Sequence, residues 1–113
     1  MRPLVFVSAA RKELLKLPDA AQDEIGFELY WAQLGKVPRH AKPLKGFGGG
    51  VFEIAIELME GAFRAAYVVR LRNAIYVLHV FQKKSKSGIA TPKSDIDLIR
   101  ERLKHAEEID AAG

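Results

Sequence analysis

The sequence has 113 residues, 49% of them hydrophobic and 28% charged, with a formal net charge of +4 and no cysteine. This length suits a single domain spanning residues 1–113, and the lack of cysteine excludes a disulfide framework and a thiolate metal site. The lack of cysteine also fits a reducing cytoplasm, where we expect the protein to act. No stretch is long and apolar enough to span a bilayer, so we expect no membrane partner. The modest positive charge fits either simple solubility or a polyanionic partner.

The N-terminal third predicts one strand followed by a helical hairpin. Pro3–Val7 is short and apolar, as strands often are, and Ser8 offers a hydroxyl to cap the helix that follows. Pro18 ends that helix. Asp19, with Gln22 three residues later, resembles a capping box that starts a second helix.

The second helix is predicted to end at Gly35 and to cover a sheet with one apolar stripe. Gly26 lies inside this helix, where glycine costs about 1 kcal/mol relative to alanine, and close packing against a neighbour would explain it. The apolar stripe consists of Ala21, Ile25, Leu29 and Ala32.

The middle of the chain predicts a loop and then a three-stranded meander. Residues 36–50 contain two prolines and four glycines, which favour a loop. Three β-prone runs follow, and their short connections allow only antiparallel neighbours. These runs are Val51–Leu58, Ala62–Leu71 and Ala74–Phe81.

Thr91 and Pro92 predict the start of a final helix, because threonine caps helices and proline is favoured at their first position. One face of this helix is apolar and consists of Ile96, Ile99, Leu103 and Ala106. The predicted order is β-α-α-β-β-β-α. Since strands and helices are segregated in that order, the expected fold class is α+β.

Side chains alternate along a strand, which sorts the meander onto two faces. One face is apolar and is expected to lie under the helices. It consists of Phe52, Ile54, Ile56, Leu58, Phe63, Ala65, Tyr67, Val69, Tyr76, Leu78 and Val80. The other face carries Glu53, Glu57, Arg64, Arg70, His79, Phe81 and Lys83, and also Val77.

Two interpretations of the charged face remain open. Half-exposed antiparallel sheets are commonly solvated, with cross-strand ion pairs such as Glu53–Arg64. Alternatively the face binds RNA, because cations contact phosphates and an aromatic ring stacks on bases. The residues that would bind RNA in this way include Arg70, Phe81 and Lys86. The positive charge gathers at one end, where Lys83, Lys84 and Lys86 occur together.

No motif predicts a metal site or a cofactor. His40, His79 and His105 are expected in a loop, a strand and a helix, without the spacing of metal ligands. Any chemistry is therefore expected to be metal-independent.

Several short motifs resemble, in their order and spacing, the RelE/ParE toxin superfamily, and in particular its HigB-like, phage-derived branch. The resemblance covers nearly the whole chain. The motifs are Phe52-Glu53-Ile54, Gly61-Ala62-Phe63-Arg64-Ala65-Ala66-Tyr67, Leu78-His79-Val80-Phe81-Gln82-Lys83-Lys84-Ser85 and Thr91-Pro92.

The resemblance implies a RelE-like fold and a toxin of a type II toxin–antitoxin pair, whose partner is a cognate antitoxin with a helix-turn-helix. Members of this branch are typically ribosome-dependent endoribonucleases that act on mRNA without a metal. In the implied reaction the ribose 2′-hydroxyl attacks the adjacent phosphate, so the enzyme must stabilise charge on phosphate and move protons.

The resemblance also assigns roles to residues. Arg64 would stabilise the phosphate, while Lys83 and Lys84 would bind phosphate or transfer protons. Glu53 would act as a base or orient Arg64, and His79 would donate a proton. The implied catalytic set is thus Glu53, Arg64, His79, Lys83 and Lys84.

Two positions depart from the pattern of the branch. This chain has Ala55 where an arginine often follows the first-strand motif, and Arg70 is the arginine that would compensate. It has Ile99 where alanine is frequent, which is a packing variation. Two other functions remain open, namely a ParE-like toxin that inhibits DNA gyrase and a catalytically inactive basic binding module.

Overall fold

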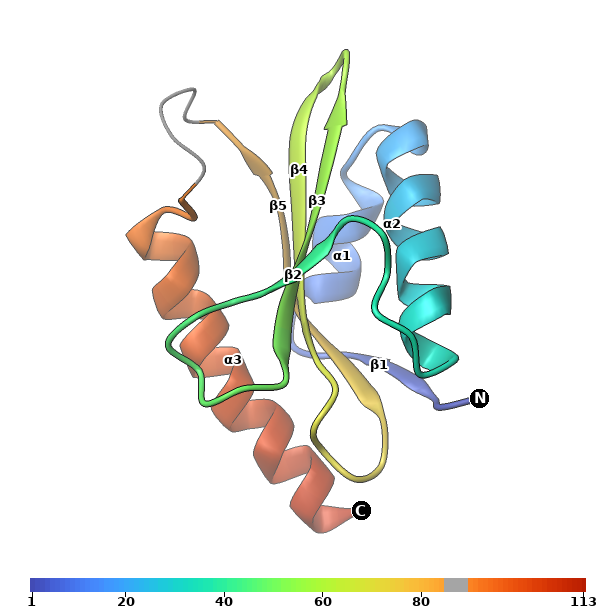
Figure 1. The fold of residues 1–113 in the computed structure, drawn as a ribbon. Coiled ribbons are helices and arrows are strands. Elements are labelled where there is room, and N and C mark those ends of the chain that lie inside the picture. The colour runs from blue at the N-terminus through green and yellow to red at the C-terminus, as the bar shows by residue number, and fades with distance from the viewer. Residues whose placement is uncertain (85–89) are drawn as a thin grey trace.

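The computed structural model describes residues 1–84 and 90–113, and it places helices on both faces of a five-stranded sheet (Figure 1). The fold is α+β, as predicted. The elements in chain order are β1 (Leu4–Phe6), α1 (Ala10–Leu15), α2 (Asp19–Gln33), β2 (Ala41–Pro43), β3 (Val51–Leu58), β4 (Gly61–Val68), β5 (Ile75–Lys83) and α3 (Lys93–Ala112).

The sheet has the strand order β1-β5-β4-β3-β2. The three long strands form the predicted antiparallel meander, and β2 adds to it as an antiparallel edge strand. β1 lies at the other edge and runs parallel to β5, pairing Leu4–Phe6 with Ile75–Val77. β5 therefore continues well past the end of β1.

One face of the sheet packs against α1 and α2. The side chains of this core include Ile25 and Leu29 from α2 and Ile54, Phe63 and Tyr67 from the strands. The predicted stripe of α2 is confirmed, because Ala21, Ile25, Leu29 and Ala32 are all at most 3% exposed.

The opposite face is not left to solvent, and this corrects the sequence-based expectation. α3 covers it, as Figure 1 shows, with Ile99, Leu103 and Ala106 packed against Val68 and Leu78. Ala66 also lies in this second core, and its short side chain leaves room for the helix. The charged residues of this side therefore lie at the end of the sheet near the start of α3.

A β-bulge in β5 changes the expected faces of that strand. Ala66 pairs with His79 and the next residue, Tyr67, pairs with Val77, so Leu78 is the extra residue. A bulge of this kind reverses the alternation on one side of it. Tyr76 and Leu78 therefore belong to the α3 core and Val77 to the α1–α2 core, opposite to the predicted sorting.

The helix starts also differ from their predicted capping. Ser8 has a positive φ of 52° and α1 has no side-chain cap. The Gln22 amide donates to the carbonyls of Leu15 and Leu17 at 3.3 and 2.9 Å, so it closes the end of α1 rather than a capping box. α3 begins after Pro92 without a side-chain cap.

The glycine-rich segment before β3 is held by arginines rather than left loose. Arg70 donates to the carbonyls of Phe47 and Gly49, and Arg100 donates to that of Gly46. Gly50 has φ of 74°, and a Cβ there would lie 2.8 Å from the Cβ of Arg70. Only glycine fits this position without strain.

Gly26 has nothing within 4 Å of the position of a Cβ, so close packing does not explain it. Among the helices described, none combines the length and the apolarity needed to cross a bilayer.

Candidate RNA-binding face

Four of the predicted site residues share the α3 side of β4 and β5. In the cross-strand register Arg64 lies opposite Phe81, Ala62 opposite Lys83, and Ala66 opposite His79. Directly opposite residues of an antiparallel pair have Cβ atoms about 5 Å apart. The pleat thus gathers a guanidinium, an ammonium, an imidazole and an aromatic ring.

This group is less open than the sequence suggested. Arg64 is 7% exposed, His79 5% and Lys83 7%. Phe81 is half-buried, and the neighbouring Lys84 is exposed. The expectation of a single open side is therefore wrong, although the residues do lie on one face.

Arg64 makes its ion pair with Glu57 and not with Glu53. Its Nη1 donates to Glu57 Oε2 at 2.9 Å and to the carbonyl of Phe63 at 3.1 Å. The Glu57 side chain is 69% exposed, whereas that of Arg64 is 8% exposed. Because the Glu57 carboxylate is largely exposed, solvent screens its attraction to Arg64. Glu57 therefore lies where an incoming anion would compete with it for the guanidinium.

Glu53 instead holds the residue that precedes α3. It lies opposite Ala66, two pairs along from Arg64, and its Oε2 accepts a hydrogen bond of 2.6 Å from the hydroxyl of Thr91. Thr91 therefore binds the sheet rather than capping the helix.

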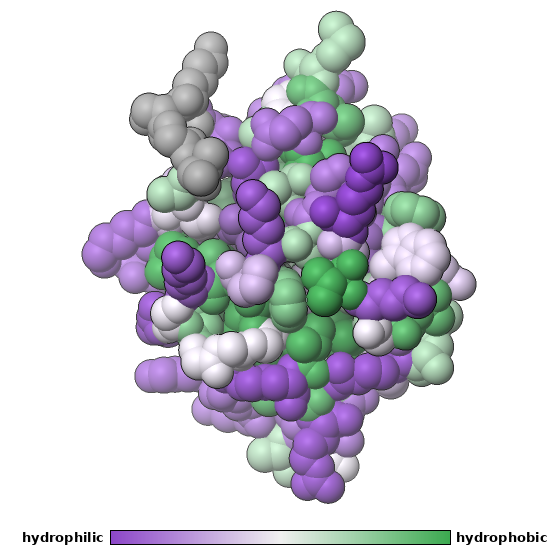
Figure 2. Space-filling model, viewed as in Figure 1, coloured by the Kyte–Doolittle hydropathy of each residue, from purple (hydrophilic) through white to green (hydrophobic). Residues whose placement is uncertain are grey.

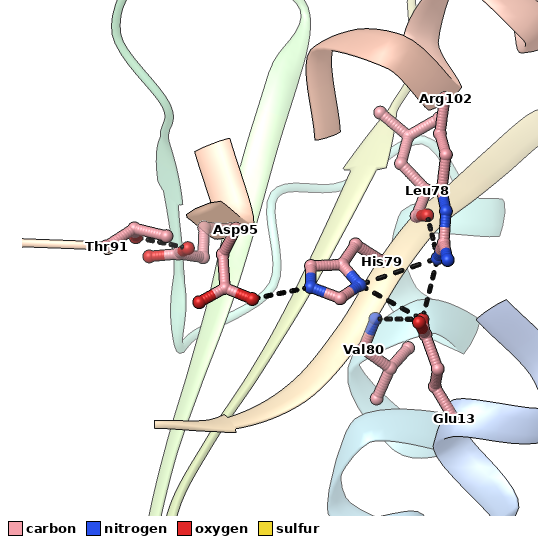
Figure 3. A network of polar contacts seen from close by, with 8 residues as sticks. Glu13, Leu78, His79, Val80, Thr91, Asp95 and Arg102 are labelled. Atoms are coloured by element: carbon pink, nitrogen blue, oxygen red, sulfur yellow. Dashed lines mark hydrogen bonds and ion pairs between the residues drawn. The ribbon is translucent and has the colours of Figure 1, made fainter. Parts of the chain in front are cut away.

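His79 lies between two carboxylates, as Figure 3 shows. Its Nδ1 is 3.0 Å from Glu13 Oε1 and its Nε2 is 2.7 Å from Asp95 Oδ1. Its ring stacks on that of Phe81, with centroids 4.7 Å apart and planes at 16°. His79 thereby joins α1, β5 and the first turn of α3.

Glu13 and Arg102 form hydrogen bonds with backbone groups of β5 at the edge of the sheet beyond the end of β1. Glu13 Oε1 accepts the backbone N–H of Val80 at 3.1 Å. Arg102 Nη1 donates to the carbonyl of Leu78 at 3.0 Å and to Glu13 Oε1 at 2.8 Å. Buried backbone groups need such partners, and here side chains replace a missing strand (Figure 3).

These contacts shift two pKa values. Burial opposes ionisation of Glu13, but hydrogen bonds from His79, Arg102 and the N–H of Val80 outweigh it and lower its pKa to about 2. Burial would lower the pKa of His79, but hydrogen bonds to Glu13 and Asp95 raise it above its ordinary value. The two carboxylates thus favour the imidazolium form of His79 over the neutral ring.

The remaining predicted residues lie elsewhere or outside the description. Arg70 follows β4 at the end opposite Lys83, where it donates to the loop carbonyls and pairs with Glu107 at 3.3 Å. The structure therefore does not bring Arg70 to Arg64, and it cannot replace the arginine missing at Ala55, which faces Arg64. Lys86 lies outside the described residues.

Sequence reasoning missed Glu13, Asp95 and Arg102. One signal was present, because Arg102 lies beside Leu103 within the stripe of Ile99, Leu103 and Ala106. A charged residue at the edge of a buried stripe predicts a buried partner. Across residues 1–84 and 90–113, no three His, Asp or Glu side chains are grouped so as to hold a metal ion.

A family model described as phage-derived protein Gp49-like (DUF891) matches residues 12–104. The chain belongs to this Gp49-like family. The match includes every residue of the face described above. A comparison with curated protein sequences found no significant match.

Solved structures share the fold of this Gp49-like chain. The Escherichia coli toxin RelE in the free state, with two arginines replaced by alanine, is 17% identical, with a TM-score of 0.58 over 92% of this chain and 96% of that chain. The isolated E. coli RelE toxin is 17% identical, with a TM-score of 0.58 over 89% and 98%. The RelBE2 toxin–antitoxin complex of Mycobacterium tuberculosis is 21% identical, with a TM-score of 0.46 over 74% and 93%. The two E. coli RelE structures show that the fold is RelE-like, as the resemblance of the sequence motifs implied.

Proposed function

We propose that this chain is the toxin of a type II toxin–antitoxin pair and cleaves mRNA on the ribosome without a metal. The observation that supports the proposal most is the register of β4 and β5, which sets Arg64 opposite Phe81 and two pairs from the Ala62–Lys83 pair on the same face. This arrangement offers two cations for a phosphate and a ring for a base. The family and the RelE-like fold agree with it.

In the proposed reaction the ribose 2′-hydroxyl gives up its proton to solvent and attacks the adjacent phosphate, and the bond from phosphorus to the 5′-oxygen of the next nucleotide breaks. Arg64 exchanges Glu57 for the phosphate and stabilises the charge that develops on it. Lys83 and Lys84, at the end of β5, bind the backbone and provide the proton for the departing oxygen. Phe81 stacks on a base beside the scissile bond.

His79 and Glu53 take positioning roles in this proposal. Both ring nitrogens of His79 are held by carboxylates, so it orients the Phe81 ring rather than releasing a proton. Glu53 holds Thr91 and does not contact Arg64. Because Thr91 and Asp95 lie at the start of α3, both residues hold the start of this helix against the RNA-binding face.

The proposal is tested with purified protein, ribosomes and a defined mRNA. We expect wild type to cleave the mRNA only when ribosomes are present, and Arg64→Ala and Lys83→Ala to lose at least about 100-fold in rate, as removal of a charge-stabilising group does. Arg72→Ala, which changes an exposed arginine of the β4–β5 turn, should retain activity. Circular dichroism and thermal melting check that all variants fold.

Intact mRNA in the presence of wild type and ribosomes would refute the ribonuclease proposal. A supercoiling assay with DNA gyrase then separates the alternatives. Inhibition of gyrase indicates the ParE-like function, and no effect leaves a binding module.

A further inference from the structure

The outer side of α2 carries an unusual amount of exposed apolar and aromatic surface. Phe27 is 57% exposed, Tyr30 44% and Leu34 40%, and Val37 just after the helix is 65% exposed. Trp31 lies among them, with its ring 6.0 Å from that of Phe27 and 6.1 Å from that of Tyr30. In Figure 2 apolar and weakly polar side chains follow the edge of the molecule where α2 lies. Contiguous exposed apolar surface of this kind marks interaction sites.

A groove of about 480 Å³ runs between α2 and the segment 36–40. Its apolar floor is formed by Phe27, Trp31, Val37 and Pro38. Glu28, at 2% exposure, fixes the far wall, because its carboxylate accepts the backbone N–H of His40 at 2.8 Å and contacts His40 Nδ1 at 3.2 Å. The groove is therefore a built feature rather than a gap beside a loose loop.

The charges at the rim are arranged on opposite sides. Lys36 and Arg39 line the wall formed by the segment 36–40, with Lys36 Nζ 5.9 Å from the Trp31 ring. Glu24 lies on the α2 side of the groove. Acidic side chains of a ligand would complement the basic wall.

The neighbouring edge strand is closed to an incoming strand. The carbonyl of His40 accepts from the N–H of Ala55 and the N–H of Leu44 donates to the carbonyl of Val51, both in β3. The backbone groups of Ala41 and Pro43 therefore point away from β3, toward the open edge of the sheet. The N–H of Ala41 is already donated to the carbonyl of Pro38 at 3.2 Å, and proline has no N–H. A β-strand would find no outward donor here, whereas a helix needs none.

We propose that the groove between α2 and residues 36–40 binds an amphipathic helix of a protein partner. Its apolar stripe would cover Phe27, Trp31 and Val37, and its acidic side would face Lys36 and Arg39. This inference rests on the proposed function, in which that partner is the antitoxin.

The probe is the protein encoded by the reading frame next to this gene, which is tested as the candidate antitoxin. Its affinity for the chain is measured by calorimetry, and its ability to restore growth is measured by coexpression. Val37→Asp should weaken binding at least about tenfold, as loss of a central apolar contact does, and should abolish rescue. Arg39→Glu should weaken binding and reduce its dependence on salt. Leu15→Asp, at a 58% exposed residue of α1, is the matched control and should bind like wild type.

Cleavage of mRNA by the chain without the partner is measured in parallel, and it reports on the proposed function independently. Equal rescue of wild type and Val37→Asp would overturn the groove as the docking site, as would no binding by the candidate antitoxin. Sedimentation of the isolated chain tests whether a second copy of this chain occupies the groove instead. If wild type dimerises and Val37→Asp is monomeric, the groove binds a second copy and the proposal is wrong.

Discussion

His79 is the residue on which the candidate face depends most, because it links three elements through two carboxylates and a stacked ring. Its raised pKa follows from its hydrogen bonds to Glu13 and Asp95, which outweigh the effect of burial. Since the folded-state pKa exceeds the ordinary value of about 6.5, the stability that His79 contributes is complete below that pH. It is lost as the pH rises through the folded-state pKa.

The variant Asp95→Asn should lower the pKa of His79, because it removes one of the two carboxylates that stabilise the imidazolium. Nuclear magnetic resonance titration of the ring carbon–proton signals measures this directly. Asp97→Asn is the matched control, since Asp97 pairs with Lys93 and not with His79. An unchanged His79 titration in Asp95→Asn would contradict the bond seen at 2.7 Å.

Glu13 should make the protein sensitive to acid. Its pKa falls from 4.5 to about 2 in the folded state, so its contribution is present above 4.5 and is lost as the pH falls through about 2. The free energy of unfolding, measured with urea, should therefore fall more for wild type than for Glu13→Gln as the pH is lowered over this range. The difference should be on the order of 1 kcal/mol, after allowance for the partial exposure of Glu13.

For this acid prediction, the exposed residue Glu101 supplies the control. Glu101→Gln should retain the pH dependence of wild type. Equal slopes for wild type and Glu13→Gln would mean that the hydrogen bonds of Glu13 do not stabilise its carboxylate.

Glu57→Gln should leave the fold intact and favour RNA binding. The pair with Arg64 has one largely exposed partner, so the free energy of unfolding should change by less than about 1 kcal/mol. Removal of the competing carboxylate should tighten binding of a short RNA by a few-fold, measured by fluorescence anisotropy. Weaker binding by Glu57→Gln would argue that the carboxylate takes part in binding the RNA.

At the scale of the elements, the sequence predicted the three long strands, the hairpin of α1 and α2, and the buried stripes of α2 and α3. Their apolar periodicity is strong, and it persists whatever the helices pack against. Residues 41–43 gave no such signal, because β2 is three residues long and contains a proline. The sequence also did not reveal the bulge at Leu78. Both sides of the sheet have an apolar core, so β5 would bury apolar side chains with or without the bulge.

Two glycines, Gly26 within α2 and Gly50 just before β3, give a prediction at the scale of the elements. Gly26→Ala should stabilise the protein by about 1 kcal/mol, because the site is open and alanine favours helix. Gly50→Ala should destabilise it by about 1–3 kcal/mol, because of its positive φ and the nearby Arg70. Urea unfolding compares the two. Destabilisation by Gly26→Ala would show that α2 is constrained in a way the structure does not contain.

At the scale of the whole molecule, the candidate RNA-binding face and the proposed docking groove lie on opposite sides of the sheet. α3 flanks the first, and α2 forms one wall of the second (Figure 1). The sequence predicted that Arg64, His79, Phe81 and Lys83 share a face, because side chains alternate regularly in β4 and in the part of β5 that follows the bulge. It could not predict their burial, since that depends on where α3 starts and on its contacts with Glu53 and His79.

The most direct test of the central claim maps the 5′ ends of cellular mRNA shortly after the chain is expressed. Wild type and Arg72→Ala should produce new ends within translated regions and arrest growth. Arg64→Ala, expressed at the same level and equally folded, should produce none. New ends in equal number with Arg64→Ala would contradict the account, because the face built around this arginine would then not be where RNA is cut.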